Sequence, residues 1–419
     1  MNTRLAIRGG PQLRTRPFTS WPLSTSADQE RLIRVLDSEC WGGEGPLARE
    51  FEQKFATRHQ TIDAVAVTNG TVSLLLCLRA LGIKPRDEVI VPALTWIATA
   101  TSVLEANAVP IIVDVDPRTY CIDPNAVRAA ITPRTVAVIP VHLYSHMADM
   151  DALRALASMH SLAIIEDCAH AHGASFRHES AGSIGTFGSF SFQSSKPMTA
   201  GEGGIVISRD KGLLDKVYSQ RNCGRYGAER GCPILGGNQR MTEWQAAILL
   251  GQLEQLDQRA EKRERSIRRL REKLAACAGI SILADQPAVT KRPMYRLSFH
   301  YDERQTGIPL WAFMEAVRAE GIPIEPIYQP IYANPLWYEG LATGPSWYGR
   351  SVPHVRCPVA ERIAHAAGFT LPHYVLLGPD QDVDDVAAVF HKVLTNAHEA
   401  ADVTDKAKEF VKGLLRMTR

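Results

Sequence analysis

Seven short runs of β-branched and other apolar residues lie between positions 63 and 208, and they constrain the fold more than any other feature. The runs are DAVAV, EVIVP, VPIIVDV, TVAVIPVHL, LAIIED, FGSFSF and GIVIS. Helix-like segments such as residues 71–81 and 95–106 separate most of them, which is typical of a mainly parallel sheet covered on both faces. The last two runs are close enough to form a hairpin. The sequence therefore predicts an α/β fold with a seven-stranded, mainly parallel sheet.

The pattern changes after Met241, where a long helical stretch carries an apolar stripe. Its members are Leu249, Leu253, Leu256, Ile267, Leu270 and Leu274. We place the domain boundary inside this helix and expect an N-terminal arm (1–30), a large α/β domain (31–255) and a smaller C-terminal α+β domain (256–419). The arm either clasps a partner or stays loose before a helix at 28–38. The small domain is expected to hold a strand at MYRLSFHYDE, helices at 308–320 and 383–396, and Pro-rich loops at 321–372.

Composition excludes several classes of protein. With 22% charged residues and a formal charge of +2, the 419-residue chain lacks the basic bias of a nucleic-acid binder. Basic residues between 259 and 273 are interleaved with Glu261, Glu264 and Glu272, as on a solvated helix face. The eight cysteines form no CxxC pair, the N-terminus does not resemble a signal peptide, and no apolar run is long enough for a membrane helix. We expect a soluble, cytoplasmic protein.

The segment VTNGTVSL, residues 67–74, joins the first strand to a helix. Gly70 and Thr71 would begin that helix, and the free backbone amides of a helix N-terminus readily bind phosphate. Because Asn-Gly is also a common turn, a purely structural role stays open.

The segment IIEDCAHAHG, residues 164–173, delivers Asp167 to the end of an apolar strand. Open α/β sheets bind ligands at that edge, where a carboxylate can keep a ring nitrogen protonated. A rival interpretation is a metal site made of Asp167, Cys168, His170 and His172. Alternate residues of a strand share one face, so Cys168 would oppose the others if the strand continued. A capping Asp with packed His residues is a third possibility.

The segment FSFQSSKPMTAGEGG, residues 190–204, places Lys196 in a loop of small and hydroxyl residues between two strands. A partly desolvated lysine can lose its proton and form an imine, and Ser191 offers a hydroxyl for phosphate. An isolated loop lysine would more often be a solvated charge. The fourth segment, GGNQRMTEWQAAI at 236–248, leads through Asn238 into the long helix, where Asn is first of all a helix cap.

These four segments, in this order and with this spacing, resemble the DegT/DnrJ/EryC1/StrS family of pyridoxal-phosphate (PLP) aminotransferases. The resemblance runs from about Trp21 to the C-terminus. It implies the PLP-dependent transferase fold, aspartate aminotransferase-like or fold type I. It also implies an obligate homodimer with two shared active sites and no metal.

The resemblance also implies roles for single residues. Lys196 is matched to the imine-forming base, Asp167 to the partner of the ring nitrogen, and His170 to the neighbour of the ring hydroxyl. The other matched residues are Gly70, Thr71 and Ser191 at the phosphate, Trp96 stacked on the ring, and Asn238 reaching the phosphate of the second subunit. Dehydratases of the family carry His where this chain has Lys196, which favours transamination.

Within the family, the stretches VPALTWIATATSVLEANAVPIIVDVDPRTYCIDP and IPVHLYSHMADMDAL are most similar to glutamine-dependent inosose aminotransferases of aminoglycoside biosynthesis. This likeness implies amino transfer from L-glutamine, or glutamate, to a scyllo-inosose-type keto-cyclitol or a keto-sugar. Ser194 and Ser195 stand where those enzymes would have Gln-Gly, so the ketone stays open. Alternatives are a dehydrating enzyme like 3-amino-5-hydroxybenzoate synthase, a nucleotide-keto-sugar aminotransferase and a noncatalytic PLP-binding protein. Candidate donor-carboxylate anchors are Arg221, Arg225 and Arg240, and candidate substrate contacts are His142, Tyr144 and Tyr328.

Overall fold

The computed structural model describes residues 4–227, 230–335, 337 and 355–401, and the chain divides into two compact units. The large unit comprises Pro22–Ala260 and Gln286–Tyr295. The small unit comprises the residues up to Trp21, Glu261–Asp285 and the residues from Arg296 onward. No helix in the described ranges is long and apolar enough to cross a lipid bilayer.

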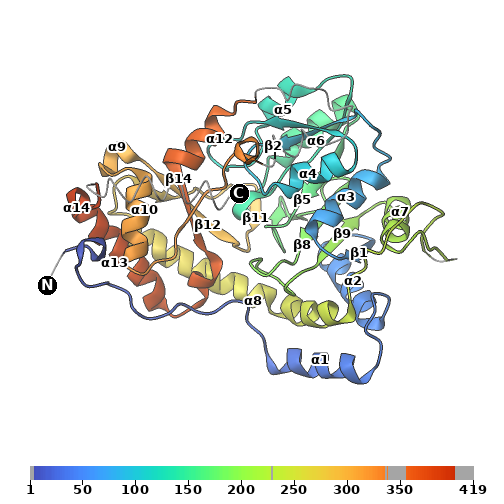
Figure 1. The fold of residues 1–419 in the computed structure, drawn as a ribbon, viewed down its shortest axis with the longest axis horizontal. Helices are drawn as coiled ribbons and strands as arrows, with labels where there is room; N and C mark the ends of the chain where they lie inside the picture. The colour runs from blue at the N-terminus through green and yellow to red at the C-terminus, as the bar shows by residue number, and fades with distance from the viewer. Residues whose placement is uncertain (1–3, 228–229, 336, 338–354, 402–419) are drawn as a thin grey trace. The chain divides into compact units, whose positions relative to one another are not determined.

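The large unit is built on the predicted seven-stranded sheet (Figure 1). Its spatial order is β1-β9-β8-β5-β4-β2-β3. Strand β9 runs antiparallel to both neighbours, β1 and β8, and the other pairings are parallel. The α/β prediction is thus confirmed, including the hairpin of the last two runs. The strand bounds are β1 Asp63–Val67, β2 Glu88–Pro92, β3 Val109–Val113, β4 Thr135–Val138, β5 Ala163–Asp167, β8 Phe187–Ser191 and β9 Gly204–Ser208.

Helices cover the sheet of the large unit, and a small second sheet flanks it. The second sheet has the order β11-β6-β7, with β6 Ser175–Phe176, β7 Glu179–Ser180 and β11 Val289–Lys291. The helical elements are α1 Ser26–Asp37, α2 Pro46–Arg58, α3 Gly70–Ala80, α4 Ala98–Glu105, α5 Pro124–Ala130, η2 Leu143–Ser145, α6 Met150–His160, α7 Lys211–Arg221 and the first part of α8 Glu243–Leu274.

Local caps set where the helices begin. Helix α1 starts at Ser26, two residues before the predicted position, because Thr25 and Asp28 form a reciprocal capping box. In Figure 1 this helix runs along the first half of α8, to which the Arg31–Glu254 ion pair connects it. Helix α4 starts at Ala98, so Thr95 and Trp96 lie in the turn before it.

The small unit contains a four-stranded antiparallel sheet packed with helices. The sheet order is β10-β12-β14-β13, and Phe299, Phe313, Phe369 and Phe390 form an aromatic core. The predicted Pro-rich loops of 321–372 contain β13, β14 and α12, while residues 338–354 lie outside the described ranges. The elements are η1 Ala6–Arg8, β10 Ile280–Ile282, β12 Arg296–Tyr301, α9 Glu303–Thr306, α10 Leu310–Ala319, β13 Glu325–Pro326, η3 Ile331–Ala333, α12 Pro358–Arg362, η5 Ile363–Ala367, β14 Gly368–Pro372, η6 His373–Leu377, α13 Asp380–Thr395 and α14 Ala397–Ala401.

Three arginines of the N-terminal segment and of α8 are buried. Arg14 of the N-terminal segment forms ion pairs with Asp382 and Asp385 of α13, which tie this segment to its own unit. On α8, Arg263 is fully buried and donates to His373 Nδ1, and Arg259 donates to Gln252. The prediction of a wholly solvated basic face was therefore wrong for Arg259 and Arg263, because each has a polar acceptor inside the protein.

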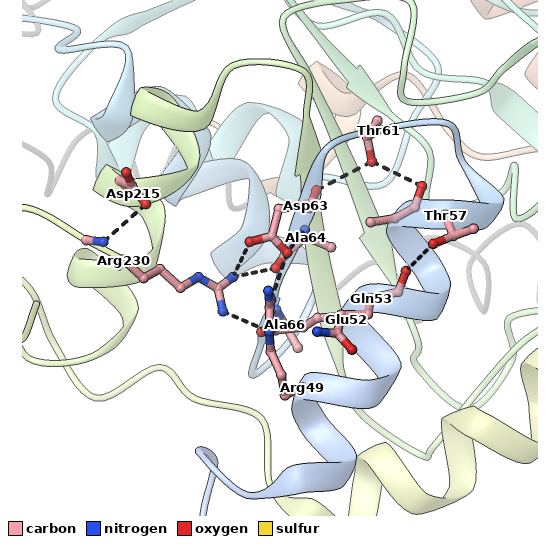
Figure 2. Close-up of polar contacts among 12 residues, drawn as sticks. Arg49, Glu52, Gln53, Thr57, Thr61, Asp63, Ala64, Ala66, Asp215 and Arg230 are labelled. Atoms are coloured by element: carbon pink, nitrogen blue, oxygen red, sulfur yellow. Dashed lines mark hydrogen bonds and ion pairs between the residues drawn. The ribbon is translucent and has the colours of Figure 1, made fainter. Parts of the chain in front are cut away.

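The outer edge of β1 is capped by charged side chains. Ala66 donates its N–H to Glu52 of α2, while Arg230 and Arg221 donate to the carbonyls of Ala64 and Ala66. Glu52 also forms ion pairs with both arginines, and Figure 2 shows Glu52 and Arg230 meeting beside the strand. An uncovered edge would expose a row of unpaired backbone groups. This network therefore closes the sheet at its first strand.

Candidate active site

Three of the four chemical motifs meet at one edge of the large-unit sheet. Strand β5 ends at Asp167, β8 ends at Ser191, and β1 ends at Val67, paired with the first residue of β9. These strands are adjacent in the order β1-β9-β8-β5. The loop with Lys196 connects β8 to β9 at the same edge. The sheet topology therefore gathers residues that are far apart in sequence.

Gly70 and Ser191 lie in direct contact where α3 begins. A Cβ built on Gly70 would lie 2.6 Å from the Ser191 Cβ, so no larger residue fits without displacement. Asn69 caps the helix by accepting the Val72 N–H at 2.9 Å. Thr71 occupies the first turn. The arrangement brings a helix N-terminus and a hydroxyl together, as an anion-binding site requires.

Asp167 is a buried carboxylate held by neutral donors. Its Oδ1 accepts the Ala169 N–H at 3.1 Å, and its Oδ2 accepts the Thr99 hydroxyl at 2.9 Å. Among the described residues, no cation forms an ion pair with it. Burial raises the pKa of Asp167, against the opposing effects of these two hydrogen bonds and the charges of Lys196 and His142. The carboxylate is thus desolvated and without a counter-ion in direct contact.

Lys196 lies within the protein and is only 8% exposed. Its Nζ is 4.6 Å from the centre of the Tyr295 ring, and the Tyr295 hydroxyl is hydrogen bonded to Ser195 Oγ at 2.9 Å. The alternative of a solvated loop lysine is therefore wrong. Sequence reasoning missed Tyr295 because it lies about 100 positions away and read only as the start of a strand.

His170 lies between two tyrosine rings. The Tyr295 ring is 4.2 Å away and the Tyr144 ring 5.6 Å away, nearly parallel to the imidazole. Tyr144 and Ser145 both have positive φ, which is uncommon for such residues. Ser145 Oγ accepts the Tyr295 N–H and lies 3.1 Å from the carbonyls of both His170 and Pro293, which share its one proton. These bonds join the His170 turn to the Tyr295 segment.

For two predicted site residues, Trp96 and Asn238, the described contacts are those of the backbone. Trp96 is 61% exposed and lies three residues before Thr99. Its carbonyl accepts the Thr99 N–H. Asn238 forms a backbone bridge with Asn222, and the next residue, Gln239, accepts the Thr68 N–H. Asn238 lies in a loop beside the end of β1, where Arg240 forms a backbone bridge with Val67. A contact of Asn238 with a second subunit remains a prediction.

The rival metal site is not assembled. Among the described residues, the His, Cys, Asp and Glu side chains close enough to share an ion are His142, Glu166 and Cys168, without Asp167, His170 or His172. Hydrogen bonds already saturate His142 and Glu166. His142 bonds Glu166 and accepts the Ala148 N–H, and Glu166 accepts three further backbone N–H groups. Burial also raises the Cys168 pKa, which opposes the thiolate that a metal needs.

The structure narrows the list of substrate contacts. Arg221 is buried and ion-paired with Glu52, and His142 is buried and bonded to Glu166, so both side chains already have partners within the protein. Arg240 donates to Asn222 Oδ1, and Arg225 is exposed. Tyr328 belongs to the small unit.

Comparison with known proteins gives full-length matches. The chain is 42% identical over 412 residues to a Streptoalloteichus tenebrarius protein provisionally named L-glutamine:3-amino-2,3-dideoxy-scyllo-inosose aminotransferase, covering 94% of this chain and 99% of the relative. It is 40% identical over 423 residues to the L-glutamine:2-deoxy-scyllo-inosose aminotransferase of the same organism, covering 95% and 99%.

A solved structure and a family model agree with these matches. The crystal structure of a 3-amino-5-hydroxybenzoic acid synthase superimposes with a TM-score of 0.82 at 32% identity, covering 91% of this chain and all of the other. The model of the DegT/DnrJ/EryC1/StrS aminotransferase family matches residues 22–391. The large parallel sheet is thus that of the PLP-dependent transferase fold, and this chain belongs to the DegT/DnrJ/EryC1/StrS aminotransferase family.

Proposed function

We propose that this enzyme transfers an amino group from L-glutamine to the ring ketone of a scyllo-inosose-type cyclitol, in aminocyclitol antibiotic biosynthesis. The proposal is supported by two relatives, each about 40% identical along nearly the whole chain, whose names give this donor and two such ketones. The observation that carries the chemistry is the buried Lys196 beside the buried Asp167, at the ligand-binding edge of the sheet.

The residues at this edge fit PLP. A buried carboxylate without an ion-pairing cation suits a protonated ring nitrogen, which would supply the missing positive charge. Because Gly70 has no side chain, the Ser191 hydroxyl lies directly against a helix N-terminus, and this pairing suits a phosphate. Lys196 is buried, and a desolvated lysine amine can lose its proton and form an imine with an aldehyde. We therefore propose Lys196 as the attachment point and Asp167 as the partner of the ring nitrogen.

When bound, PLP would supply an aldehyde that accepts and returns the amino group and a ring that withdraws electrons from the reacting carbon. Lys196 would hold and return the proton moved from the donor carbon, as a general base and then a general acid. The Tyr295 face, 4.6 Å from Nζ, suits the ammonium form of Lys196 at the stage when it carries that proton. Asp167 would keep the ring nitrogen protonated.

Other residues of the large unit would hold the cofactor in place. Gly70 and Thr71 at the start of α3, with Ser191, would bind the phosphate. The indole of Trp96, which is 61% exposed, would cover one ring face. His170 accepts the Tyr144 N–H at Nδ1, so its other ring nitrogen carries the proton in the neutral form and would face the ring hydroxyl.

We also propose a homodimer in which Asn238 of each chain reaches the phosphate in the other. Support comes from the large apolar side chains that are exposed on the large unit, which are Ile33, Leu36, Trp41, Ile62, Trp96, Met159, Tyr226 and Leu235. The division into a PLP-binding domain of residues 31–255 and a small domain of residues 256–419 stays a prediction.

The test is a visible spectrum of purified protein with PLP, before and after L-glutamine, followed by scyllo-inosose and 2-deoxy-scyllo-inosose. We expect a cofactor band that changes with L-glutamine, returns with the ketone and is altered in Lys196→Ala. Mass spectrometry should find the aminated cyclitol. A protein that binds no PLP would refute the proposal. Release of water and an aromatic product from an aminodehydroquinate-type substrate would instead assign the synthase activity of the structural relative.

A further inference from the structure

Two threonine hydroxyls form a chain of hydrogen bonds that ends at the Asp167 carboxylate. Thr99 Oγ1 is 2.9 Å from Asp167 Oδ2, and Thr95 Oγ1 is 2.8 Å from Thr99 Oγ1. Both side chains are buried, with residue exposures of 1% for Thr99 and 4% for Thr95. Two adjacent buried hydroxyls need a reason beyond packing, because valine would fill the same space without burying polar atoms.

We propose that Thr95 and Thr99 form a hydroxyl chain that keeps Asp167 ionised and oriented to receive the ring nitrogen of the cofactor. This inference rests on the proposed function, since it assumes that Asp167 meets a ring nitrogen. Both threonines are positioning residues, because they act through Asp167.

The direction of the chain follows from the number of protons. An ionised carboxylate only accepts hydrogen bonds, so Thr99 gives its one proton to Asp167. Thr99 then has only its oxygen left for Thr95, so Thr95 is the donor. The two bonds point the same way and polarise each other, which strengthens the second. A proton on Asp167 Oδ2 would reverse both bonds, so the chain direction is coupled to the charge of Asp167.

The main chain alone does not fix the carboxylate. Asp167 donates its N–H to Pro140 and accepts the His142 N–H at its carbonyl, which anchors the backbone to the segment after β4. The terminal torsion of an Asp side chain is broad, so the carboxylate needs contacts of its own. These contacts are the Ala169 N–H on Oδ1 and the Thr99 hydroxyl on Oδ2. Of these two contacts, only the Thr99 hydroxyl comes from a different element, the first turn of α4.

The Thr99 hydroxyl is one of two uncharged groups that favour the ionised form of Asp167, the other being the Ala169 N–H. Burial raises the Asp167 pKa, and the opposing groups are the Ala169 N–H, the Thr99 hydroxyl and the charges of Lys196 and His142. In the proposed cycle Lys196 gains and loses protons, and His142 is already bonded to Glu166. The hydroxyl chain donates to Asp167 as long as the carboxylate is ionised, and it carries no charge of its own.

The test compares Thr99→Val, which keeps the shape and removes the hydroxyl, with Thr99→Ser, which keeps the hydroxyl. Thr95→Val removes only the outer donor. Ser102→Ala is the matched control, because Ser102 is a buried hydroxyl of the same helix that donates to the Thr99 carbonyl instead. Thermal unfolding of each variant would show that it is folded.

The first measurement uses cofactor-free protein and the infrared carboxylic-acid band of Asp167, identified by its loss in Asp167→Asn. We expect the protonated band of Thr99→Val to persist to higher pH than in the wild type. Thr99→Ser should behave as the wild type, Thr95→Val should shift less, and Ser102→Ala should not shift.

The second measurement is PLP affinity by absorbance across pH. Loss of a hydrogen bond to a charged group weakens binding by about tenfold or more, so Thr99→Val should bind PLP that much less tightly. The difference should shrink at high pH, where Asp167 is ionised in every variant. An unchanged infrared titration in folded Thr99→Val would overturn the inference even if PLP binds. Wild-type protein that binds no PLP would overturn the proposed function, while the infrared result would still report on the hydroxyl chain.

Discussion

Glu52 and Asp167 are two buried carboxylates of the large unit in opposite surroundings. Glu52, 1% exposed, forms ion pairs with Arg221 at 2.9 Å and Arg230 at 2.8 Å, and accepts the Ala66 N–H. Asp167, 5% exposed, accepts hydrogen bonds from one backbone N–H and one hydroxyl. The first has fixed counter-ions within the chain, whereas the second has neutral donors.

Their pKa values move in opposite directions for this reason. Burial pushes both upward, but Arg221, Arg230 and the Ala66 N–H together bring the Glu52 pKa below its ordinary value. For Asp167 the effect of burial prevails, and the pKa is raised. A carboxylate that serves the fold is compensated inside the protein, while one that awaits a cationic ligand is not. We take Glu52 as structural and Asp167 as functional.

The largest effect is expected from the cation near Asp167. Lys196→Ala should lower transamination by about 10²–10⁴-fold, because it removes the proposed base. The melting temperature should change little, since the substitution also removes the cost of burying a lysine charge. Turnover with L-glutamine and a keto-cyclitol, together with thermal unfolding, would measure both. Lys211→Ala, which removes a surface lysine paired with Asp215, is the control and should alter neither. Retained turnover in Lys196→Ala would contradict the proposal that Lys196 and Asp167 form the active site.

The second effect concerns stability. Glu52→Gln should lower the free energy of unfolding by about 3–5 kcal/mol, because the buried Arg221 would lose its counter-ion and Arg230 would keep only its longer pair with Asp63, at 3.5 Å. Turnover per folded molecule should be preserved. Denaturant unfolding of the cofactor-free protein measures the difference. Glu50→Gln on the same helix is the matched control, since its exposed pair with Lys54 is worth about 1 kcal/mol or less. Equal losses in the two variants would contradict the structural role.

A smaller effect on stability is expected at Asp167. Asp167→Asn keeps one acceptor oxygen for the Ala169 N–H, and its amide N–H can donate to Thr99 Oγ1 in place of the bond that Oδ2 accepted. The cost of burying a charge is also removed, so the free energy of unfolding should change by about 1 kcal/mol or less. PLP affinity should nevertheless fall by about 10- to 100-fold, because a charge-assisted hydrogen bond is lost. Absorbance titration with PLP measures that affinity. A stability loss as large as that of Glu52→Gln would make Asp167 a structural carboxylate too.

The sequence predicted the sheet well because its strands are local apolar runs. All seven became strands of one sheet, since period and length suffice to recognise a buried strand. The strand ends then followed, which placed Asp167, Ser191 and the Lys196 loop at one edge. The hairpin of β8 and β9 was predicted because only the short Lys196 loop separates them.

The parts that failed depend on partners far away in sequence. Arg263 belongs to a helix face that looks solvated, and only the fold brings His373 to it. Tyr295 carried no motif, although it borders both Lys196 and His170. Glu52 had no signal beyond a charged position on an amphipathic helix, because its two arginines come from the segment near residue 225. The local sequence pattern does not reveal a residue whose role depends on contacts with residues far away in sequence.

The smallest effect is a pair of opposite pH dependences. Glu52 has a lowered pKa, so its contribution to stability is present above the ordinary Glu value of about 4.3 and is lost as pH falls through the folded value. Asp167 has a raised pKa, so its contribution is present below the ordinary Asp value of about 3.9 and is lost as pH rises through the folded value. Urea unfolding of cofactor-free protein from pH 3 to 7 would measure both. The stability advantage of wild type over Glu52→Gln should shrink toward acid, whereas its stability relative to Asp167→Asn should fall toward neutral pH. If both stability differences changed with pH in the same direction, the surroundings of Glu52 and Asp167 would shift the two pKa values in the same direction.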